Sequence, residues 1–371
     1  MFAFEIFLTQ IVLKLTLFTL IYLHICLSWK LFLQIRGFIV NKRLVSIVIP
    51  VFNAEKFVGR TISSVLDQTY NKLEIIIVDD GSPDRSIEIC HQFNDPRIKI
   101  IKQANRGLAG ARNTGIRNAT GDYVALVDAD DLWTKDKIEK HVSHLEKNPH
   151  VGISFSYSLL IDEEDNPTGL KQIPTKVTNI TPDYILRRNP IGNGSSPVFR
   201  RKVFQDIEFI DHLHGEEETF YFDESFKRAE DVECWLRIAL ETDWACEGIP
   251  ELLTLYRINS GGLSANALSQ YEYLERIIDK YSKAYPEVLG DSVSLAKAYF
   301  QRYIARRAVS MRDAPLAMEM LHKSISSDIR ILYEEPRKTL ITLGAVYFLY
   351  LTPKKVYAHL EQAAMNFAKG F

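Results

Sequence analysis

Two short apolar runs, each ending in a cluster of acidic residues, constrain the fold of this chain more than any other feature. The first run is Ile75–Val78, followed by Asp79–Ser82, and the second is Tyr123–Val127, followed by Asp128–Asp131. Short β-branched runs bounded by turn residues are typical of buried parallel strands. Ligands of open α/β sheets bind beyond the carboxyl ends of the strands, where both acidic clusters would lie. Because crowded carboxylates repel one another, the pattern indicates a site for a divalent cation that carries the phosphates of a nucleotide.

Composition narrows the class of protein. With 371 residues the chain can form one large domain or two ordinary ones. The 45 Lys and Arg residues balance the 47 Asp and Glu residues, so no global basic field favours nucleic acid as a partner. The 4 cysteines have no metal-ligand spacing, and we interpret them as reduced thiols of a cytosolic domain.

Residues 1–40 form a separate hydrophobic segment. The stretch Ile6–Ile35 is dominated by apolar residues, and basic residues are more frequent after it than before it. This bias predicts that the rest of the chain lies at the cytoplasmic face of the membrane, with a single-pass or peripheral anchor. A cleaved signal peptide, a poorly structured leader and an extension from an upstream start codon remain as alternatives.

From residue 45 onward, strand and helix patterns alternate. The pattern predicts strands over 45–50, 73–78, 98–101 and 123–127, and helices over 54–68, from 82 or 84 to 93, and over 136–148. Asn53 is the expected N-cap of the first helix. Such alternation is typical of a doubly wound α/β sheet. The glycine-rich run Gly107–Asn113 could either cradle phosphate or pack a helix closely on the sheet.

Five segments in order resemble the motifs of family 2 glycosyltransferases with the GT-A fold. They are Val45–Glu55, Glu74–Ser82, Asn105–Asn113, Asp122–Asp131 and Ala229–Leu236. The resemblance covers roughly residues 44–264, which we predict to be the glycosyltransferase domain. It implies a Rossmann-like mixed sheet flanked by helices, preceded by the N-terminal hydrophobic helix and followed by a helical C-terminal region over 265–371.

The resemblance also implies a nucleotide-sugar donor, with a UDP-sugar as the expected one, and a divalent metal, Mn²⁺ or Mg²⁺. The positions that match the donor-binding loops are Pro50, Phe52, Asn53, Glu55, Asp79, Asp80, Gly107, Arg112, Asp128 and Arg257. Asp128 and Asp130 match the Asp-x-Asp signature that holds the metal. Arg257 departs from the family pattern, because Ile258-Asn259 follows it where a histidine is common.

The segment around Glu230 and Asp231 resembles the family's Glu-Asp motif on the acceptor side. An acceptor hydroxyl must lose its proton as it attacks, and a positioned carboxylate can accept that proton. We assign Asp231 as the general base and Glu230 as the neighbour that orients the acceptor. One base and one metal predict a single displacement with inversion.

Three other regions have open interpretations. Asn193–Ser196 could line the acceptor pocket or form a simple loop, and the polar stretch His212–Glu218 is interpreted as a mobile loop near the site. Helical patterns begin at Tyr271. Within them, Leu340–Leu351 is too short to span a membrane and is either a buried packing helix or an interfacial patch.

The leading hypothesis is an inverting glycosyltransferase that acts on a membrane-associated glycan or lipid-linked acceptor, such as a lipopolysaccharide or exopolysaccharide precursor. A processive polysaccharide synthase would add several spans and a Gln-x-x-Arg-Trp segment, neither of which is found in the sequence. A nucleotidyl transferase would open on a Gly-rich basic loop. A catalytically inactive binding protein would lack the acids that this chain retains.

Overall fold

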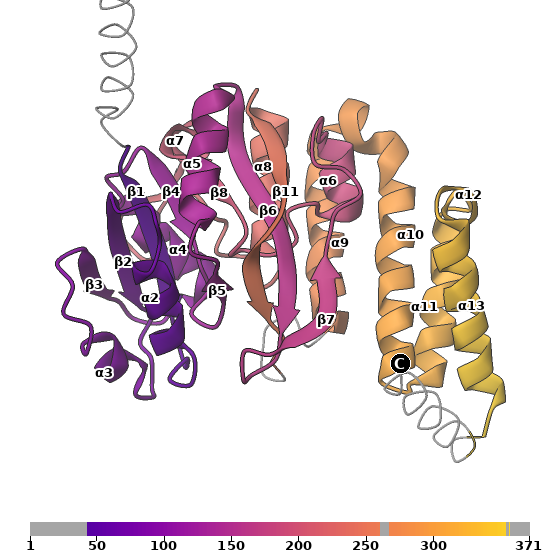
Figure 1. Cartoon of the computed structure of the whole chain (residues 1–371). Helices are drawn as coiled ribbons and strands as arrows, with labels where there is room; N and C mark the ends of the chain where they lie inside the picture. The colour runs from indigo at the N-terminus through magenta and orange to yellow at the C-terminus, as the bar shows by residue number, and fades with distance from the viewer. Residues whose placement is uncertain (1–42, 260–266, 354–355, 357–371) are drawn as a thin grey trace, which may run out of the picture. The chain divides into compact units, whose positions relative to one another are not determined.

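The computed structural model describes residues 43–259, 267–353 and Val356. The predicted hydrophobic helix of residues 1–40 lies outside these residues. The described part contains a mixed β-sheet flanked by helices, and a helical region follows it (Figure 1). No helix among the described residues combines the length and the apolar character that crossing a bilayer requires.

Within the described residues, nine strands form one sheet, in the order β3-β2-β1-β4-β8-β6-β11-β5, with β7 paired to β6. Strands β1, β2, β3 and β4 are parallel, whereas β8 is antiparallel to both β4 and β6. The strands are β1 (Val45–Val51), β2 (Leu73–Asp79), β3 (Ile98–Lys102), β4 (Tyr123–Leu126), β5 (Leu132–Trp133), β6 (Val151–Ile161), β7 (Pro167–Gln172), β8 (Val198–Arg200) and β11 (Ala245–Arg257).

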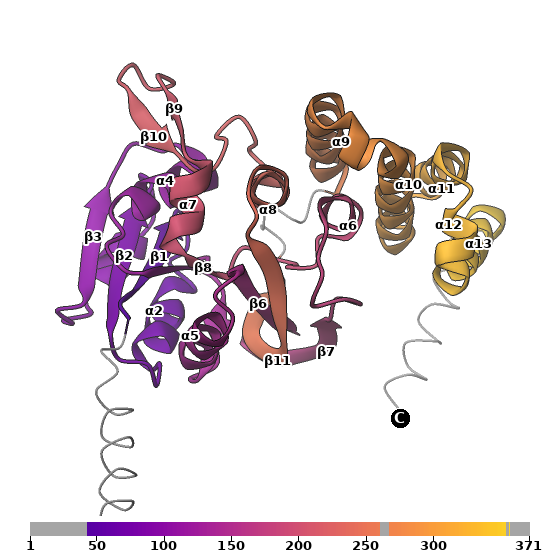
Figure 2. The same ribbon diagram turned by 90° about the horizontal axis from the view of Figure 1, so that it is seen from above.

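Helices cover both faces of the sheet. Seen from above, α2 and α5 lie on one face and α4, α7 and α8 on the other (Figure 2). Side chains of a strand alternate between faces, so Ile47 and Ile49 of β1 pack with the α2 and α5 side while Val48 packs with α4 and α8. These helices are α2 (Val58–Leu66), α4 (Gly107–Arg117), α5 (Lys137–Lys147), α7 (Arg201–Ile207) and α8 (Glu230–Glu241).

The predicted strands are confirmed to within about one residue at their ends, but two helix predictions need correction. The first helix begins at Val58, and Phe57 occupies its N-cap. Asn53 has a φ of 52°, so the prediction that it caps this helix is wrong. The next helix, α3 (Ser86–Cys90), is a single short turn region rather than one that reaches residue 93.

The glycine-rich run Gly107–Asn113 belongs to a helix that packs on the sheet. It forms the first turns of α4, and the same helix brings Gly115 against Val48 of β1. A Cβ atom on Gly115 would lie 2.1 Å from Val48 Cγ1. Within the run, Ala109 and Ala111 are buried in the same apolar cluster as Val48, whereas a Cβ atom on Gly110 would meet Arg106 and Glu224. The alanines of the run therefore pack the helix on the sheet, as one of its two interpretations expected.

The C-terminal region is helical, as predicted. It contains α9 (Ala267–Ala284), α10 (Pro286–Ser310), α11 (Ala314–Ser327), α12 (Ile331–Glu334) and α13 (Pro336–Leu351). Residues of α10, α11 and α13 share one buried apolar cluster that includes Ile304, Leu321 and Val346. The predicted domain boundary near residue 264 falls among residues outside the described ranges and stays a prediction.

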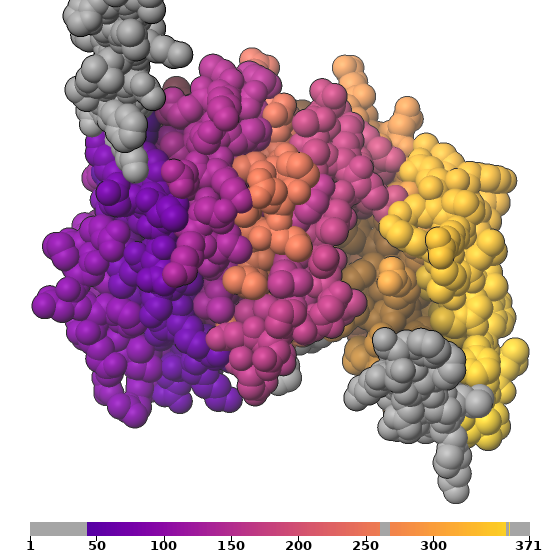
Figure 3. All heavy atoms as spheres, in the orientation of Figure 1, coloured from indigo at the N-terminus to yellow at the C-terminus, as the bar shows by residue number. Residues whose placement is uncertain are grey.

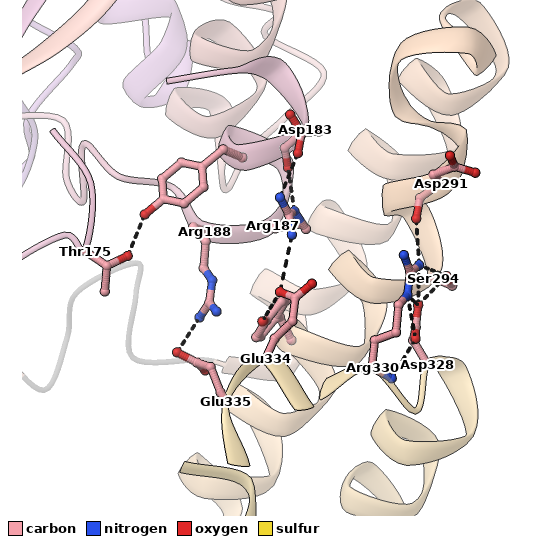
Figure 4. Close-up of polar contacts among 12 residues, drawn as sticks. Thr175, Asp183, Arg187, Arg188, Asp291, Ser294, Asp328, Arg330, Glu334 and Glu335 are labelled. Atoms are coloured by element: carbon pink, nitrogen blue, oxygen red, sulfur yellow. Dashed lines mark hydrogen bonds and ion pairs between the residues drawn. The ribbon is translucent and has the colours of Figure 1, made fainter. Parts of the chain in front are cut away.

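Helix α6 (Pro182–Arg188) connects the sheet domain to the C-terminal helices (Figure 4). Arg188 forms an ion pair of 3.0 Å with Glu335, and Arg187 lies 3.4 Å from Glu334. The Arg188 guanidinium also lies 3.7 Å from the centre of the Tyr299 ring on α10. These charged and aromatic contacts add to a buried apolar cluster that the sheet domain shares with α9 and α10, including Ile277 and Leu289.

Replacing Gly115 by alanine should destabilise the protein, because the new methyl group would overlap Val48. We expect the free energy of unfolding in urea to fall by about 1–3 kcal/mol. Gly290→Ala is the matched control, because Gly290 lies in α10 with no atom near its Cβ position. That variant should gain about 0.5–1 kcal/mol from helix propensity. Equal effects in the two variants would contradict the close packing of α4 on β1.

Candidate active site

The two acidic clusters lie at one edge of the sheet. Strand β1 is flanked by β2 and β4, both parallel to it. The carboxyl ends of these three strands therefore point the same way. Asp79 is the last residue of β2 and Asp80 follows it, and Asp128 lies two residues after β4. The sequence predicted that both acidic clusters lie at the carboxyl ends of the strands, and this position is confirmed.

A buried arginine joins the second acidic cluster to the Glu-Asp motif. Arg112 of α4 donates through Nη2 to Asp128 Oδ1 at 2.7 Å and through Nη1 to Glu230 Oε1 at 2.8 Å. Its side chain is 1% exposed. Burial alone would lower the pKa of Arg112, but the nearby carboxylates of Asp128 and Glu230 raise it above its ordinary value. The sequence placed Arg112 near a diphosphate, whereas the structure places it between two protein carboxylates.

Small residues make room for this arginine. A Cβ atom on Gly194 would lie 2.2 Å from Arg112 Nη2 and 3.4 Å from Asp128 Oδ2. The next residue, Ser195, accepts a hydrogen bond from the Asp128 amide at 2.9 Å and donates to Asp131 Oδ2 at 2.5 Å. The Asn193–Ser196 segment thus holds the acidic cluster in place through hydrogen bonds. Neither interpretation of the segment from the sequence included these bonds.

Asp130 lies beside the other carboxylates of the cluster. Its Oδ2 accepts a hydrogen bond from Asn259 Nδ2 at 2.7 Å. Burial, together with the negative charge of Asp128, raises the pKa of Asp130 to about 6. Asn259 stands in the region where the family commonly has a histidine, and its amide was not predicted as part of the site.

The chemistry of this donor set fits a hard divalent cation. Asp128 and Asp130 are carboxylates whose mutual repulsion already raises the pKa of Asp130, and a cation would relieve that repulsion. Within the described residues no group of three or more metal-ligating side chains is found. Magnesium-like ions are commonly held by one or two carboxylates with substrate phosphates completing the shell, so two aspartates suffice.

Arg257 reaches the same cluster from β11. Its Nε donates to the Asp130 carbonyl at 2.7 Å, and its Nη2 lies 2.5 Å from Asp165 Oδ1. Its backbone amide donates to Asp131 Oδ1 at 2.8 Å. The guanidinium also lies over the Phe57 ring, 4.8 Å from its centre. Arg257 therefore braces the loop after β4, and its predicted contact with the donor phosphates stays a prediction.

Asp80 caps the helix that the glycine-rich run begins. Its carboxylate accepts hydrogen bonds from the amides of Arg106 and Gly107, at 2.8 and 2.9 Å, and from Gln103 Nε2 at 2.7 Å. Burial raises its pKa. The Gly107 amide therefore binds a carboxylate of the protein, and its predicted contact with the donor stays a prediction. Asp79 accepts from the Ser82 amide at 2.9 Å and is equally buried.

The loop after β1 presents the predicted donor-side residues. Phe52 is 50% exposed, so its ring is available to lie against a base. The Asn53 amide donates to Ser82 Oγ at 2.8 Å, and Glu55 Oε2 accepts from the Arg85 amide at 3.1 Å. Pro50 lies within β1, opposite Val78. These contacts connect the β1 loop to the loop after β2.

The candidate base lies at the start of α8. Ala229 precedes it with a φ of 54°, and Glu230 and Asp231 form the first turn. Burial raises the pKa of Glu230 to about 7, with the charge of Asp231 adding to the effect. Burial also raises the pKa of Asp231. A raised pKa makes a carboxylate a better proton acceptor at neutral pH.

A buried lysine lies next to the site and was not predicted from the sequence. Lys137 of α5 donates to the Ser196 carbonyl at 2.6 Å and to Thr254 Oγ1 at 3.1 Å, and its Nζ lies 3.2 Å from His141 Nε2. Burial holds the pKa of Lys137 well below its usual range. The sequence shows only a lysine at a helix start, and nothing local marks it as buried.

Most of the polar stretch His212–Glu218 is the loop that joins two antiparallel strands, β9 (Phe209–Asp211) and β10 (Glu218–Phe220). The sequence predicted a loop there, but it did not predict the two short strands that the loop connects. Beside the pair lies a cavity of about 540 Å³, lined partly by Gly107 at the start of α4. His214 Nε2 lies 2.8 Å from Glu224 Oε2 within the lining.

Comparison with known proteins identifies the family. The sequence profile of Glycosyl transferase family 2 matches residues 46–208. The Escherichia coli UDP-Glc:alpha-D-GlcNAc-diphosphoundecaprenol beta-1,3-glucosyltransferase WfgD is 31% identical over 261 residues, which cover 69% of this chain and 90% of that protein. The chain belongs to glycosyltransferase family 2. It is therefore an enzyme of sugar transfer, as its resemblance implied.

Solved structures of other glycosyltransferases share the fold. The mannosyltransferase PcManGT from Pyrobaculum calidifontis, solved with GDP-Man and Mn²⁺, has a TM-score of 0.52 at 21% identity, covering 84% of this chain and 81% of that one. Residues 1–349 of Staphylococcus aureus TarS, solved with UDP-GlcNAc, have a TM-score of 0.51 at 16% identity, covering 85% and 83%. The predicted GT-A fold is confirmed.

Replacing Arg112 by methionine should damage both stability and transfer, because Asp128 and Glu230 would lose their shared cation. Removing one partner of a buried pair commonly costs about 3–5 kcal/mol, and the partial exposure of Asp128 places the expected loss in urea unfolding near the lower end. Arg117→Met on the same helix is the control. Its ion pair with Glu218 is partly exposed and should contribute less than about 1 kcal/mol. A stable, active Arg112→Met enzyme would contradict the bridging role.

Proposed function

We propose that this family 2 glycosyltransferase moves one sugar from a nucleoside-diphosphate sugar to a hydroxyl acceptor, with inversion at the anomeric carbon. The observation that carries the proposal is the Arg112 bridge, because it holds the Asp-x-Asp motif and the Glu-Asp motif at one site. Donor and acceptor functions predicted from separate segments are thereby joined. A single carboxylate base is consistent with a single displacement.

In the proposed reaction Asp231 accepts the proton of the acceptor hydroxyl as that oxygen attacks the anomeric carbon. The bond between this carbon and the diphosphate oxygen breaks at the same time, and the nucleoside diphosphate leaves. Glu230 is held by Arg112 at 2.8 Å and orients the acceptor beside the base. The raised pKa of Asp231 favours proton transfer to it near neutral pH.

Asp128 and Asp130 are the residues that would hold the divalent cation. A bound Mn²⁺ or Mg²⁺ would supply positive charge for the developing diphosphate. Asn259 and Arg257 would keep Asp130 in place through its side chain and its carbonyl. The Mn²⁺ of PcManGT supports the choice of metal by fold analogy.

For the donor we propose a UDP-sugar, supported by the UDP-glucose named for WfgD. The acceptor of that enzyme is a lipid-linked diphosphoundecaprenol sugar. By analogy, we propose a membrane-associated glycan precursor of the cell envelope as the acceptor here, reached at the cytoplasmic face of the membrane.

Asp231→Asn should leave donor binding intact and abolish transfer, because the amide cannot accept the acceptor proton. We expect the rate of sugar transfer to fall by about 10²–10⁴-fold. The melting temperature should still rise with UDP and Mn²⁺ as in the parent enzyme. Loss of the nucleotide-induced shift would instead assign Asp231 to donor binding and remove it as the base.

Asp130→Ala should remove the metal-dependent part of nucleotide binding. In the parent protein, one of UDP, GDP, dTDP or CDP should raise the melting temperature only with Mn²⁺ or Mg²⁺, by mass action. The variant should show no such shift, whereas Glu164→Ala, at an exposed acid, should behave as the parent. If no nucleotide shifts the folded parent protein under any metal condition, the donor site itself is refuted.

A further inference from the structure

One side of helix α13 presents a row of large apolar side chains to solvent. Leu340, Ile341, Tyr347 and Leu351 are all exposed, Leu340 to 60% and Leu351 to 73%. We call these four residues the outer face of α13. Leu340, Tyr347 and Leu351 follow one another at spacings of seven and four residues, which places them on one side of the helix, with Ile341 beside Leu340. Figure 3 shows α13, in yellow, at the surface of the helical region.

The opposite side of α13 packs against the neighbouring helices. Thr339, Thr342, Val346 and Leu349 are buried. Val346 belongs to the cluster shared with α10 and α11. A helix that is apolar all round is normally covered on every side, yet α13 is covered on one. Contiguous exposed apolar residues on a soluble protein mark interaction surfaces.

The charged residues of α13 itself are basic, and one of them, Lys338, pairs at 2.7 Å with Glu335 just before the helix. The helix Pro336–Leu351 contains no acidic residue, and Arg337 and Lys338 stand in its first turn. Two lysines, Lys354 and Lys355, follow in the sequence. On the neighbouring helix α11, His322 reaches the Tyr347 hydroxyl at 3.1 Å. Basic residues in the first turn of an apolar, tyrosine-containing stripe complement the anionic headgroups of a lipid surface.

The length of α13 determines how it could meet a bilayer. Its 16 residues span about 24 Å at 1.5 Å per residue, less than the roughly 30 Å of a hydrocarbon core. A helix of this kind lies along the headgroup boundary rather than across it. We propose that the outer face of α13 docks on an anionic lipid bilayer, with its basic residues at the headgroups. The sequence allowed Leu340–Leu351 to be either a buried packing helix or an interfacial patch. Under this proposal one side of α13 is the buried packing surface and the other side is the interfacial one.

This proposal goes beyond the proposed function, because it depends on neither the donor site nor the base. A failure of sugar transfer would leave it standing, and a failure of docking would leave the chemistry standing. Local probes are needed because residues 1–40 could also bring the full chain to a membrane.

The test places an environment-sensitive thiol dye at single positions of the full chain. Leu340→Cys reports on the outer face, and Leu170→Cys is the control, because Leu170 on β7 is also 60% exposed. Both are made with Cys26→Ala, since the other three cysteines are buried. With phosphatidylglycerol vesicles, the dye at 340 should brighten severalfold and shift to shorter wavelength, while the dye at 170 should not change.

A second pair of variants tests the charge and apolar contributions. Arg337→Glu combined with Lys338→Glu should weaken the response of the dye at 340 severalfold, as should high salt. Leu351→Glu should do the same at a position where folding does not depend on burial. The proposal is overturned if the dye at 340 stays unchanged while the protein sediments with vesicles. It is equally overturned if that dye responds to protein concentration without lipid, which would identify a second copy of the chain as the occupant.

Discussion

The site depends on one buried cation shared by two carboxylates. Arg112 is almost wholly removed from water, and its charge is stable there because Asp128 and Glu230 lie within hydrogen-bond distance. A buried charge without partners is strongly unfavourable. Loss of any one of the three side chains would therefore leave an unpaired charge on the others. Since the three side chains come from α4, from the loop after β4 and from the start of α8, this interaction connects three elements and sets the distance between the Asp-x-Asp and Glu-Asp segments.

A polar layer beneath the carboxylates extends this constraint. Ser195 joins Asp128 to Asp131, and Gly194 leaves the space that Arg112 occupies. Lys137 holds the Ser196 carbonyl from the other face of the sheet. Positioning of reacting groups requires such supporting contacts, because a small displacement of a base or a metal ligand is costly to the rate. The contacts therefore explain why polar groups are buried so deeply in this enzyme.

The C-terminal helices combine two different surfaces. Through Arg187 and Arg188 of α6 they are held to the sheet domain by ion pairs and ring contacts. Through α13 they expose an apolar face bordered by basic residues. Firm attachment on one side, to which a shared apolar cluster also contributes, and apolar exposure on the other are what a region needs if it is to bring the catalytic sheet to a lipid surface.

The sequence by itself determined the strands β1 to β4, the acids at the strand ends and the family, because these follow from local periodicity and from motifs of adjacent residues. Tertiary structure alone decided the partners of those acids. Arg112 and Glu230 are 118 residues apart in the chain, and Asn259 and Asp130 are 129 apart. No local pattern records such pairs. The burial of Lys137, the strand pair β9–β10 and the half-covered state of α13 were likewise decided by packing, since each depends on what neighbouring elements cover.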